Sequence, residues 1–144
     1  MTDSPEFEIG SFTPYLLAMA TEGVGLGFSK TYKDYYGMSR TEWRVLFHLG
    51  HYGEMTATEI GQRAKLHKTK VSRAVRGLEE MRFLHRTTSE TDRRVERLSL
   101  RAPGLQAYHK LSHLAADYEA KIMERLSKRE ADILKSALRK LSDI

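Results

Sequence analysis

Four hydrogen-bonding or cationic side chains recur at helical spacing in the middle of this 144-residue chain. A helix expected from His67 or Lys68 to about Phe83 buries one apolar stripe, which consists of Val71, Ala74, Val75 and Leu78. At about 100° per residue, the opposite side of this helix carries Thr69, Ser72, Arg73 and Arg76. Such side chains donate hydrogen bonds to base edges in a DNA major groove, and no large apolar residue interrupts them. The face therefore has the chemistry of a helix that reads DNA.

A shorter helix precedes this one, and a hairpin follows it. Thr56 and Glu59 have the Thr-x-x-Glu spacing of a capping box, which opens a helix that runs to about Ala64. Residues 83–88 and 95–101 are strand-like runs, and a polar turn that leads into two arginines joins them. Two helices followed by a basic hairpin predict a winged helix.

The positive charge of the chain is concentrated in the segment that holds these elements. Residues 63–101 carry 12 Lys or Arg against 5 Asp or Glu, whereas residues 1–62 carry 4 against 8. Binding to phosphates requires such a cationic surface. Because a solvated helix face is also basic by chance in many proteins, the charge indicates DNA binding only together with the helix pair and the hairpin.

The remaining composition narrows the class of protein. The length fits one domain, and 40% hydrophobic with 30% charged residues is ordinary for a globular protein. The absence of cysteine excludes a disulfide scaffold, a thiolate metal site and a cysteine redox switch. No apolar run reaches the length of a membrane span, and the N-terminus MTDSPEFE is acidic, unlike a signal peptide. A cytoplasmic protein without membrane association is expected.

The order of these pieces resembles the MarR family of bacterial transcription regulators. The most specific part of the resemblance is an Asp-x-Arg wing with a following Leu-x-Leu, placed after such a helix pair. The resemblance covers roughly residues 11–142, and its matching segments are Thr41–Leu49, Ile60–Leu66, Lys68–Glu80, Asp92–Arg94, Arg97–Leu100 and Leu126–Leu141.

The chain departs from the family pattern at two helix boundaries. The family usually has a glycine after the recognition helix, where this chain has Glu80, Met81 and Arg82. It usually has a threonine after the Leu-x-Leu pair to cap the next helix, where this chain has Arg101. Since arginine cannot accept a hydrogen bond, that helix is expected to start later, with Pro103 in its first turn.

Four further helices are expected around the two central ones. They run from an N-cap at Thr13 to about Tyr36, from Ser39 to about Leu49, from Pro103 to Leu126, and from Ser127 to about Leu141. Capping boxes open the second and the last of them, and Gly50 and Gly53 bracket a turn. Three glycines inside the first helix are interpreted as close packing against another helix, with room for a ligand as the alternative.

The resemblance implies a mainly α fold in a single domain, residues 1–144. Residues 39–101 form the winged helix-turn-helix lobe with a two-stranded wing, and residues 11–36 and 103–142 form the dimerisation helices. In the family these helices interlock with those of a second subunit. The resulting homodimer presents two recognition helices to a palindromic operator in double-stranded DNA.

The DNA contacts divide by chemistry. Thr69, Ser72, Arg73 and Arg76 are expected to face base edges, with arginine reading guanine. Lys68, Lys70 and Arg93 are expected to neutralise phosphates. Arg94 is expected to enter the flanking minor groove, with Asp92 stabilising the wing by pairing with an arginine.

The family also has a cavity between the dimer core and the DNA-binding lobe. It commonly takes small aromatic or phenolic anions, and their binding weakens the DNA complex, which implies a repressor released by a small-molecule effector. Core packing alone is the alternative explanation for aromatic residues at these spacings. The residues expected to bind the ligand are Tyr32, Tyr36, Trp43, Arg44, Phe47, His109 and His113.

Two other functions remain open. His109 and His113 lie at i, i+4 on one helix face, so a metal-responsive regulator is one alternative; Lys110 stands where a hydrolytic zinc motif needs glutamate. A winged helix that only contacts proteins is the other. The chain has no nucleophile elbow, phosphate loop or dinucleotide fingerprint, so no catalytic residue, metal site or cofactor is expected.

Overall fold

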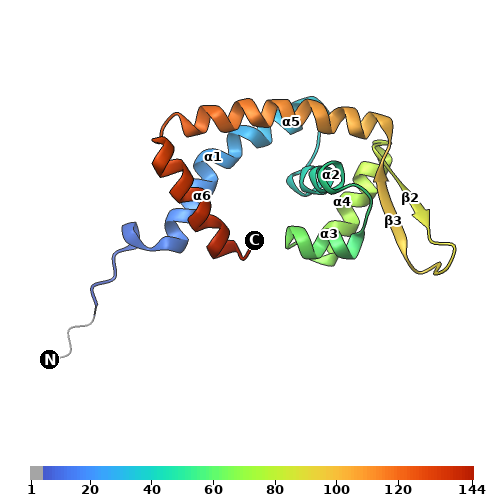
Figure 1. The fold of residues 1–144 in the computed structure, drawn as a ribbon, viewed down its shortest axis with the longest axis horizontal. Helices are drawn as coiled ribbons and strands as arrows, with labels where there is room; N and C mark the ends of the chain where they lie inside the picture. The colour runs from blue at the N-terminus through green and yellow to red at the C-terminus, as the bar shows by residue number, and fades with distance from the viewer. Residues whose placement is uncertain (1–4) are drawn as a thin grey trace.

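The computed structural model describes residues 5–144; the first four residues of the acidic N-terminus lie outside the described part of the chain. Its elements are η1 (Ile9–Ser11), α1 (Thr13–Tyr36), α2 (Arg40–Tyr52), β1 (Met55–Thr56), α3 (Ala57–Ala64), α4 (Lys68–Glu80), β2 (Leu84–Thr88), β3 (Glu96–Leu100), α5 (Ala102–Met123) and α6 (Lys128–Ser142). The long helix α5 connects two regions (Figure 1). One region, the winged-helix lobe, comprises α2, α3, α4 and the strands. The other, the helical arms, comprises α1 and α6.

The winged-helix lobe holds most of the buried core. Leu46 of α2, Ile60 of α3, Leu78 of α4 and Leu84 of β2 are each fully buried at 0% exposure. Burying one such side chain contributes about 1.5–3 kcal/mol, so these contacts fix the relative positions of the three helices and the sheet. The mainly α winged-helix fold expected from the sequence is confirmed.

The sheet has a third strand that the sequence did not predict. β3 lies between the other two strands, and all pairs are antiparallel. Met55 of β1 and Arg86 of β2 both lie opposite Leu98 of β3. Because β1 has two residues, no period-2 alternation is visible in its sequence. The strand attaches the wing to the start of α3.

Side-chain caps fix the helix starts that the sequence predicts. At α2, the Ser39 hydroxyl accepts the Glu42 N–H at 3.1 Å and the Glu42 carboxylate accepts the Ser39 N–H at 2.8 Å. The Ser-x-x-Glu pair at α6 makes the same two bonds. At α3 the box is half formed: Thr56 Oγ1 accepts the Glu59 N–H at 3.1 Å, and no return bond from Glu59 occurs within residues 5–144.

Helix α4 ends at Glu80, three residues before the expected end at Phe83. Arg82 adopts φ +63°, which reverses the chain and turns it towards β2. The Phe83 N–H then donates to the Leu78 carbonyl at 2.9 Å, a bond that closes a helix end. Arg82 therefore occupies the left-handed position for which a glycine after this helix is suited, at a conformational cost of about 1 kcal/mol.

Helix α2 continues to Tyr52, beyond the end expected at Leu49. Gly50, expected in a turn, lies inside the helix, where a Cβ would stand 2.4 Å from the Tyr108 ring of α5. Gly50 therefore allows α5 to approach α2 closely. Gly53, with φ +80°, forms the C-cap.

The ends of α1 and α5 also differ slightly from expectation. Phe12, and not Thr13, is the N-cap of α1. Helix α5 begins directly after Arg101, which makes no side-chain cap, and it ends at Met123. Between the two helices, a Cβ at Gly27 would stand 2.5 Å from the Tyr118 hydroxyl oxygen, so close packing explains this glycine.

The helical arms expose their apolar side chains. Helix α6 has no buried residue, and Ile133 and Leu141 are 59% and 63% exposed. The first half of α1 shows Leu16 and Met19 at 48% and 49%. No helix in the described residues combines the length and apolarity needed to cross a membrane.

Candidate nucleic-acid interface

Helix α4 is two-sided, as its sequence predicts. Its inner residues are 0–3% exposed and pack into the winged-helix lobe; these are Val71, Ala74, Val75 and Leu78. Its outer residues are all exposed; these are Thr69, Ser72, Arg73 and Arg76. Because the buried stripe fixes the rotation of the helix, the four outer side chains face solvent together.

The N-terminus of α4 is capped by a residue that the sequence analysis did not single out. The His67 ring nitrogen Nδ1 accepts the Thr69 N–H at 3.2 Å. This bond satisfies one of the free N–H groups of the first turn, in which the exposed Lys68 and Lys70 lie. The two lysines therefore stand at the end of the helix that attracts anions.

Among the residues that the structure describes, Arg76 has one ionic partner. Its Nε lies 3.6 Å from Glu80 Oε1, one turn later, and the two side chains are 79% and 71% exposed. An exposed i, i+4 pair of this kind contributes about 0.3–0.5 kcal/mol. The pair holds Arg76 too weakly to prevent it from binding another group.

The wing carries its arginines next to a tight turn. Asp92 Oδ1 accepts the backbone N–H of Arg94 at 3.0 Å, and both Arg93 and Arg94 are exposed. The expected pairing of Asp92 with an arginine is therefore a bond to backbone; no ion pair of Asp92 with a guanidinium is formed in the described chain. A carboxylate that accepts an N–H two residues later favours a turn, which is a direct way to shape the wing.

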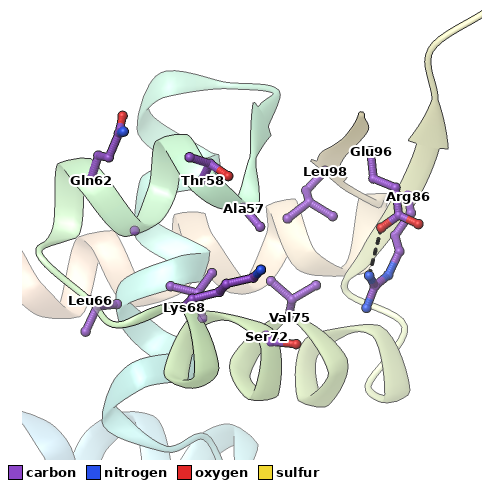
Figure 2. A pocket seen from close by; sticks show the side chains of 12 residues that line it. Ala57, Thr58, Gln62, Leu66, Lys68, Ser72, Val75, Arg86, Glu96 and Leu98 are labelled. Carbon is purple, nitrogen blue, oxygen red and sulfur yellow. Dashed lines mark hydrogen bonds and ion pairs between the residues drawn. The ribbon is translucent and has the colours of Figure 1, made fainter. Parts of the chain in front are cut away.

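A groove of about 380 Å³ lies between α3, α4 and the wing (Figure 2). Its apolar lining includes Val71, Val75 and Leu98, while Thr58, Gln62, Lys68, Ser72 and Arg86 supply polar groups. Ser72 and Lys68 thus belong both to the groove and to the outer side of α4. The groove therefore adjoins the exposed side of α4 and has both apolar and polar lining residues.

The residues expected to bind a ligand do not all belong to one cluster. Tyr32 and Trp43 stack with ring centroids 5.4 Å apart, and Phe47 lies 5.1 Å from Trp43. Tyr36 instead contacts Phe83, at 5.7 Å. The stacked pair lies at the junction of α1, α2 and α5, and Tyr32 is only 3% exposed. Packing thus accounts for much of the aromatic cluster.

A cavity of about 490 Å³ lies beside the stacked pair. Its lining includes Tyr32, Trp43, Tyr118 and Arg40, but not Arg44, Phe47, Tyr36, His109 or His113. The buried Trp43 Nε1 has no hydrogen-bond acceptor among the described residues. The cavity therefore combines aromatic walls with the Arg40 guanidinium and with two carboxylates, those of Glu22 and Glu119.

The charge of Arg40, which lines this cavity, acts on two neighbouring groups. Burial raises the pKa of the Tyr32 phenol, and the charge of Arg40 acts in the opposite direction. Burial lowers the pKa of the Arg44 guanidinium, and the neighbouring charge of Arg40 lowers it further. The sequence analysis expected Arg44 to bind a ligand; the structure places Arg40, and not Arg44, in the lining of this cavity.

His109 and His113 are exposed on α5. Within residues 5–144, no group of three or more His, Cys, Asp or Glu is arranged to hold a metal ion. Among these residues, the two imidazoles therefore lack the further ligands that a structural metal site needs.

Comparisons with known proteins agree with this geometry. The MarR family model matches residues 36–95, which span most of the winged-helix lobe. The uncharacterized HTH-type transcriptional regulator YwaE of Bacillus subtilis (strain 168) is 26% identical over 108 residues. That match covers 75% of this chain and 63% of YwaE, less than two thirds of its length.

Solved structures extend the likeness to the whole chain. The MarR/EmrR family transcriptional regulator from Acinetobacter sp. ADP1 is 26% identical, with a TM-score of 0.84 over 95% of this chain and 96% of that one. Bordetella bronchiseptica BpsR, whose DNA binding is described as regulated by 6-hydroxynicotinic acid, is 19% identical. Its TM-score is 0.87, over 96% of this chain and 99% of that one, which shows the shared fold. The family model thus matches the winged-helix lobe, and a MarR/EmrR family member shares the fold of both regions, so this chain is similar to MarR family transcriptional regulators.

Proposed function

We propose that the protein is a sequence-specific DNA-binding transcription regulator that acts as a homodimer in the cytoplasm. The observation that carries this proposal is the two-sidedness of α4. One side is anchored in the core of the lobe, and the other exposes two arginines, a serine and a threonine beside a basic wing. A helix fixed in this way suits insertion into a major groove.

The proposed contacts follow from chemistry and position. Arg73 and Arg76 read guanine edges, with Thr69 and Ser72 hydrogen bonding beside them. The first-turn lysines Lys68 and Lys70, with Arg93, neutralise phosphates and set the register. Arg94 lies in the flanking minor groove, where the bond from its N–H to Asp92 restrains the backbone.

The proposed dimer forms through residues 11–36 and 103–142. Exposed apolar residues on α1 and on α6 support it, because monomeric proteins rarely expose large contiguous apolar patches. A second copy would cover these surfaces by a two-fold axis and place two α4 helices on one palindromic operator. The DNA-binding segment, residues 39–101, remains outside that contact.

We further propose that a small aromatic anion releases the protein from its operator, as a repressor requires. The cavity beside Tyr32 and Trp43 lies where the helical arms join the lobe, so its occupant contacts both regions. Arg40 supplies the counter-charge, on a lining that also holds the carboxylates of Glu22 and Glu119. A ligand that fits only one orientation of the lobe shifts the spacing of the two α4 helices.

Trp43 is the only tryptophan, so its fluorescence reports on this cavity. Titration with aromatic carboxylates, beginning with 6-hydroxynicotinic acid, should quench it. Arg40→Gln should weaken this binding about tenfold, since a charge-assisted hydrogen bond is lost, while Arg44→Gln should change it little. The reverse result would return the role of counter-charge to Arg44. No response to any aromatic carboxylate would contradict the proposed ligand class.

Selection of bound duplexes from random DNA tests the proposed function itself. The expected product is a palindrome whose half-site centres are about 10 base pairs, or a multiple, apart. Arg76→Ala should lose preference at one position in each half-site. Binding that shows no sequence preference at any salt concentration would contradict a sequence-specific regulator.

A further inference from the structure

Along β2, the inner face of the sheet changes from apolar to charged side chains. Since side chains alternate along a strand, Leu84 and Arg86 point to the same side, which is the side that packs on the helices. Leu84 and Leu98 are buried there, at 0% and 1% exposure. Arg86, directly opposite Leu98, is the next inner-face residue towards the wing tip. The apolar contact between wing and helices therefore ends at Arg86.

At this position, Arg86 of β2 links the wing to α4 and to the neighbouring strand β3. Arg86 Nε lies 3.0 Å from Glu79 Oε2 of α4, and its Nη1 lies 2.9 Å from Glu96 Oε2 of β3. Figure 2 shows the bond to Glu96 at the end of the groove. The three side chains are 36–50% exposed, so the cluster is partly shielded from solvent. The hydrogen bond that Arg86 donates to Glu96 raises the pKa of Arg86; burial acts in the opposite direction, and the bond donated to Glu79 raises the pKa further.

This cluster of Arg86, Glu79 and Glu96 lies where the buried contacts of β2 end. Thr87 and Thr88, the last residues of β2, are exposed, so no buried side chain of that strand holds the wing beyond Arg86. Glu79 lies in the last turn of α4, three residues after Arg76. We propose that Arg86 is a positioning residue that fixes the wing tip relative to α4 through Glu79 and Glu96, and so sets the geometry with which both engage DNA. This role rests on the DNA binding proposed above.

A direct phosphate contact is the competing role for Arg86. The two roles differ in what Glu96 does. If Arg86 binds phosphate, removing the Glu96 charge frees the guanidinium and strengthens DNA binding. If Arg86 positions the wing, removing either partner weakens DNA binding in the same way, because the two residues act as a unit.

The first experiment uses no DNA. The chain has no cysteine, so Glu90→Cys at the wing turn carries one nitroxide label per subunit. Arg86→Gln and Glu96→Gln should each raise the mobility of this label in its magnetic resonance spectrum. Arg97→Gln is the matched control, since Arg97 lies on β3 and pairs more loosely, at 3.8 Å, with Glu54. An unchanged label mobility in Arg86→Gln, or an equal rise in Arg97→Gln, overturns the positioning role whatever the protein binds.

The second experiment measures affinity for a selected operator at several salt concentrations. Arg86→Gln and Glu96→Gln should each lose about three- to tenfold with an unchanged salt slope, and the double variant should lose no more than the worse single one. Arg86→Lys keeps the charge but lacks the planar guanidinium that donates to two carboxylates at once. It should therefore behave like Arg86→Gln. A shallower slope in Arg86→Gln, with tighter binding by Glu96→Gln, identifies a phosphate contact and overturns the proposal. Melting temperatures should stay within a few degrees of the parent, because half-exposed pairs contribute little to global stability.

Discussion

The two regions of the molecule use apolar residues in opposite ways. In the winged-helix lobe, Leu46, Ile60 and Leu78 are completely buried within one chain. In the helical arms, α6 has an equally regular apolar stripe, yet Ile133 and Leu141 remain more than half exposed. Because the sequence pattern is similar and the burial is not, the apolar face of the arms stays open within one chain, as the proposed homodimer requires.

This difference separates two requirements of the proposed function. A reading helix has to be rigid relative to its wing, which a self-contained core provides. The spacing of two reading helices has to be adjustable by a ligand, which an interface between chains provides. The cavity at the junction of α1, α2 and α5 lies where these two requirements meet.

Truncation of a leucine should show the largest difference in stability between the two regions. Leu78→Ala, at 0% exposure in the lobe, should lower the free energy of unfolding by about 3–5 kcal/mol, because it removes a fully buried side chain and leaves a cavity. The same truncation at Leu141 should act through association and so depend on protein concentration. Urea unfolding followed by Trp43 fluorescence at two protein concentrations measures both. Equal, concentration-independent losses would contradict the contrast between the regions.

A charge on the apolar stripe of α6 should give the next largest effect. Ile133→Asp should weaken dimer formation by roughly a hundredfold, about 2.7 kcal/mol, since a carboxylate is costly to bury at an interface. Sedimentation velocity should show monomers that retain the helical circular dichroism of the lobe. Arg139→Asp, on the polar side of the same helix, is the control. If both variants stay dimeric, the stripe on α6 is not part of the interface.

Much of the lobe was predictable because its signals are local. The period of 3.6 residues in α4 predicts both its buried stripe and its four outward side chains. The Ser39 and Glu42 capping box predicts the start of α2 to within one residue. Alternation around Leu98 and Leu100 predicts the hairpin. Each of these patterns lies within a few turns of chain, where spacing determines geometry.

What the sequence missed depends on contacts between distant segments. The strand β1 exists because Met55 pairs with Leu98, 43 positions later, and two residues carry no period. Helix α2 passes through Gly50 because Tyr108 packs there. Arg40 lines the cavity beside Trp43 and Arg44 does not, although both are arginines on one helix. The link from Arg86 to Glu79 and Glu96 likewise requires the register of the sheet.

The DNA-reading role of the lobe should survive changes in the arms. Arg76→Ala should cost about 1–3 kcal/mol of operator binding and relax preference at one base position per half-site, because a bidentate contact to guanine is lost. Lys128→Ala removes one exposed cation from α6 and should leave affinity within twofold. Fluorescence anisotropy with a panel of single-base operator variants distinguishes the two. Uniform weakening across the panel would make Arg76 a backbone contact.

The smallest effect is expected when the capping box is removed from one helix in each region. The capping boxes of α2 and α6 have matching bonds, at 2.8–3.1 Å. Ser39→Ala should lower the free energy of unfolding by about 1 kcal/mol, since α2 carries fully buried residues of the lobe. Ser127→Ala should instead fray α6 and leave the unfolding of the lobe nearly unchanged, because α6 buries no residue within its own chain.

Acid provides an independent test of the α6 box. Hydrogen bonds from the Ser127 backbone and side chain lower the pKa of the Glu130 carboxyl. A carboxylate with a lowered pKa stabilises the folded helix at pH above about 4.3, the ordinary value for glutamate, and this contribution is lost as the pH falls through the lowered value. Circular dichroism at 222 nm should therefore show an acid-dependent loss of helix in the parent that is absent in Ser127→Ala, where α6 is already frayed at neutral pH. A loss of the same size and midpoint in both proteins would mean that other carboxylates, and not this box, control the acid response of the arms.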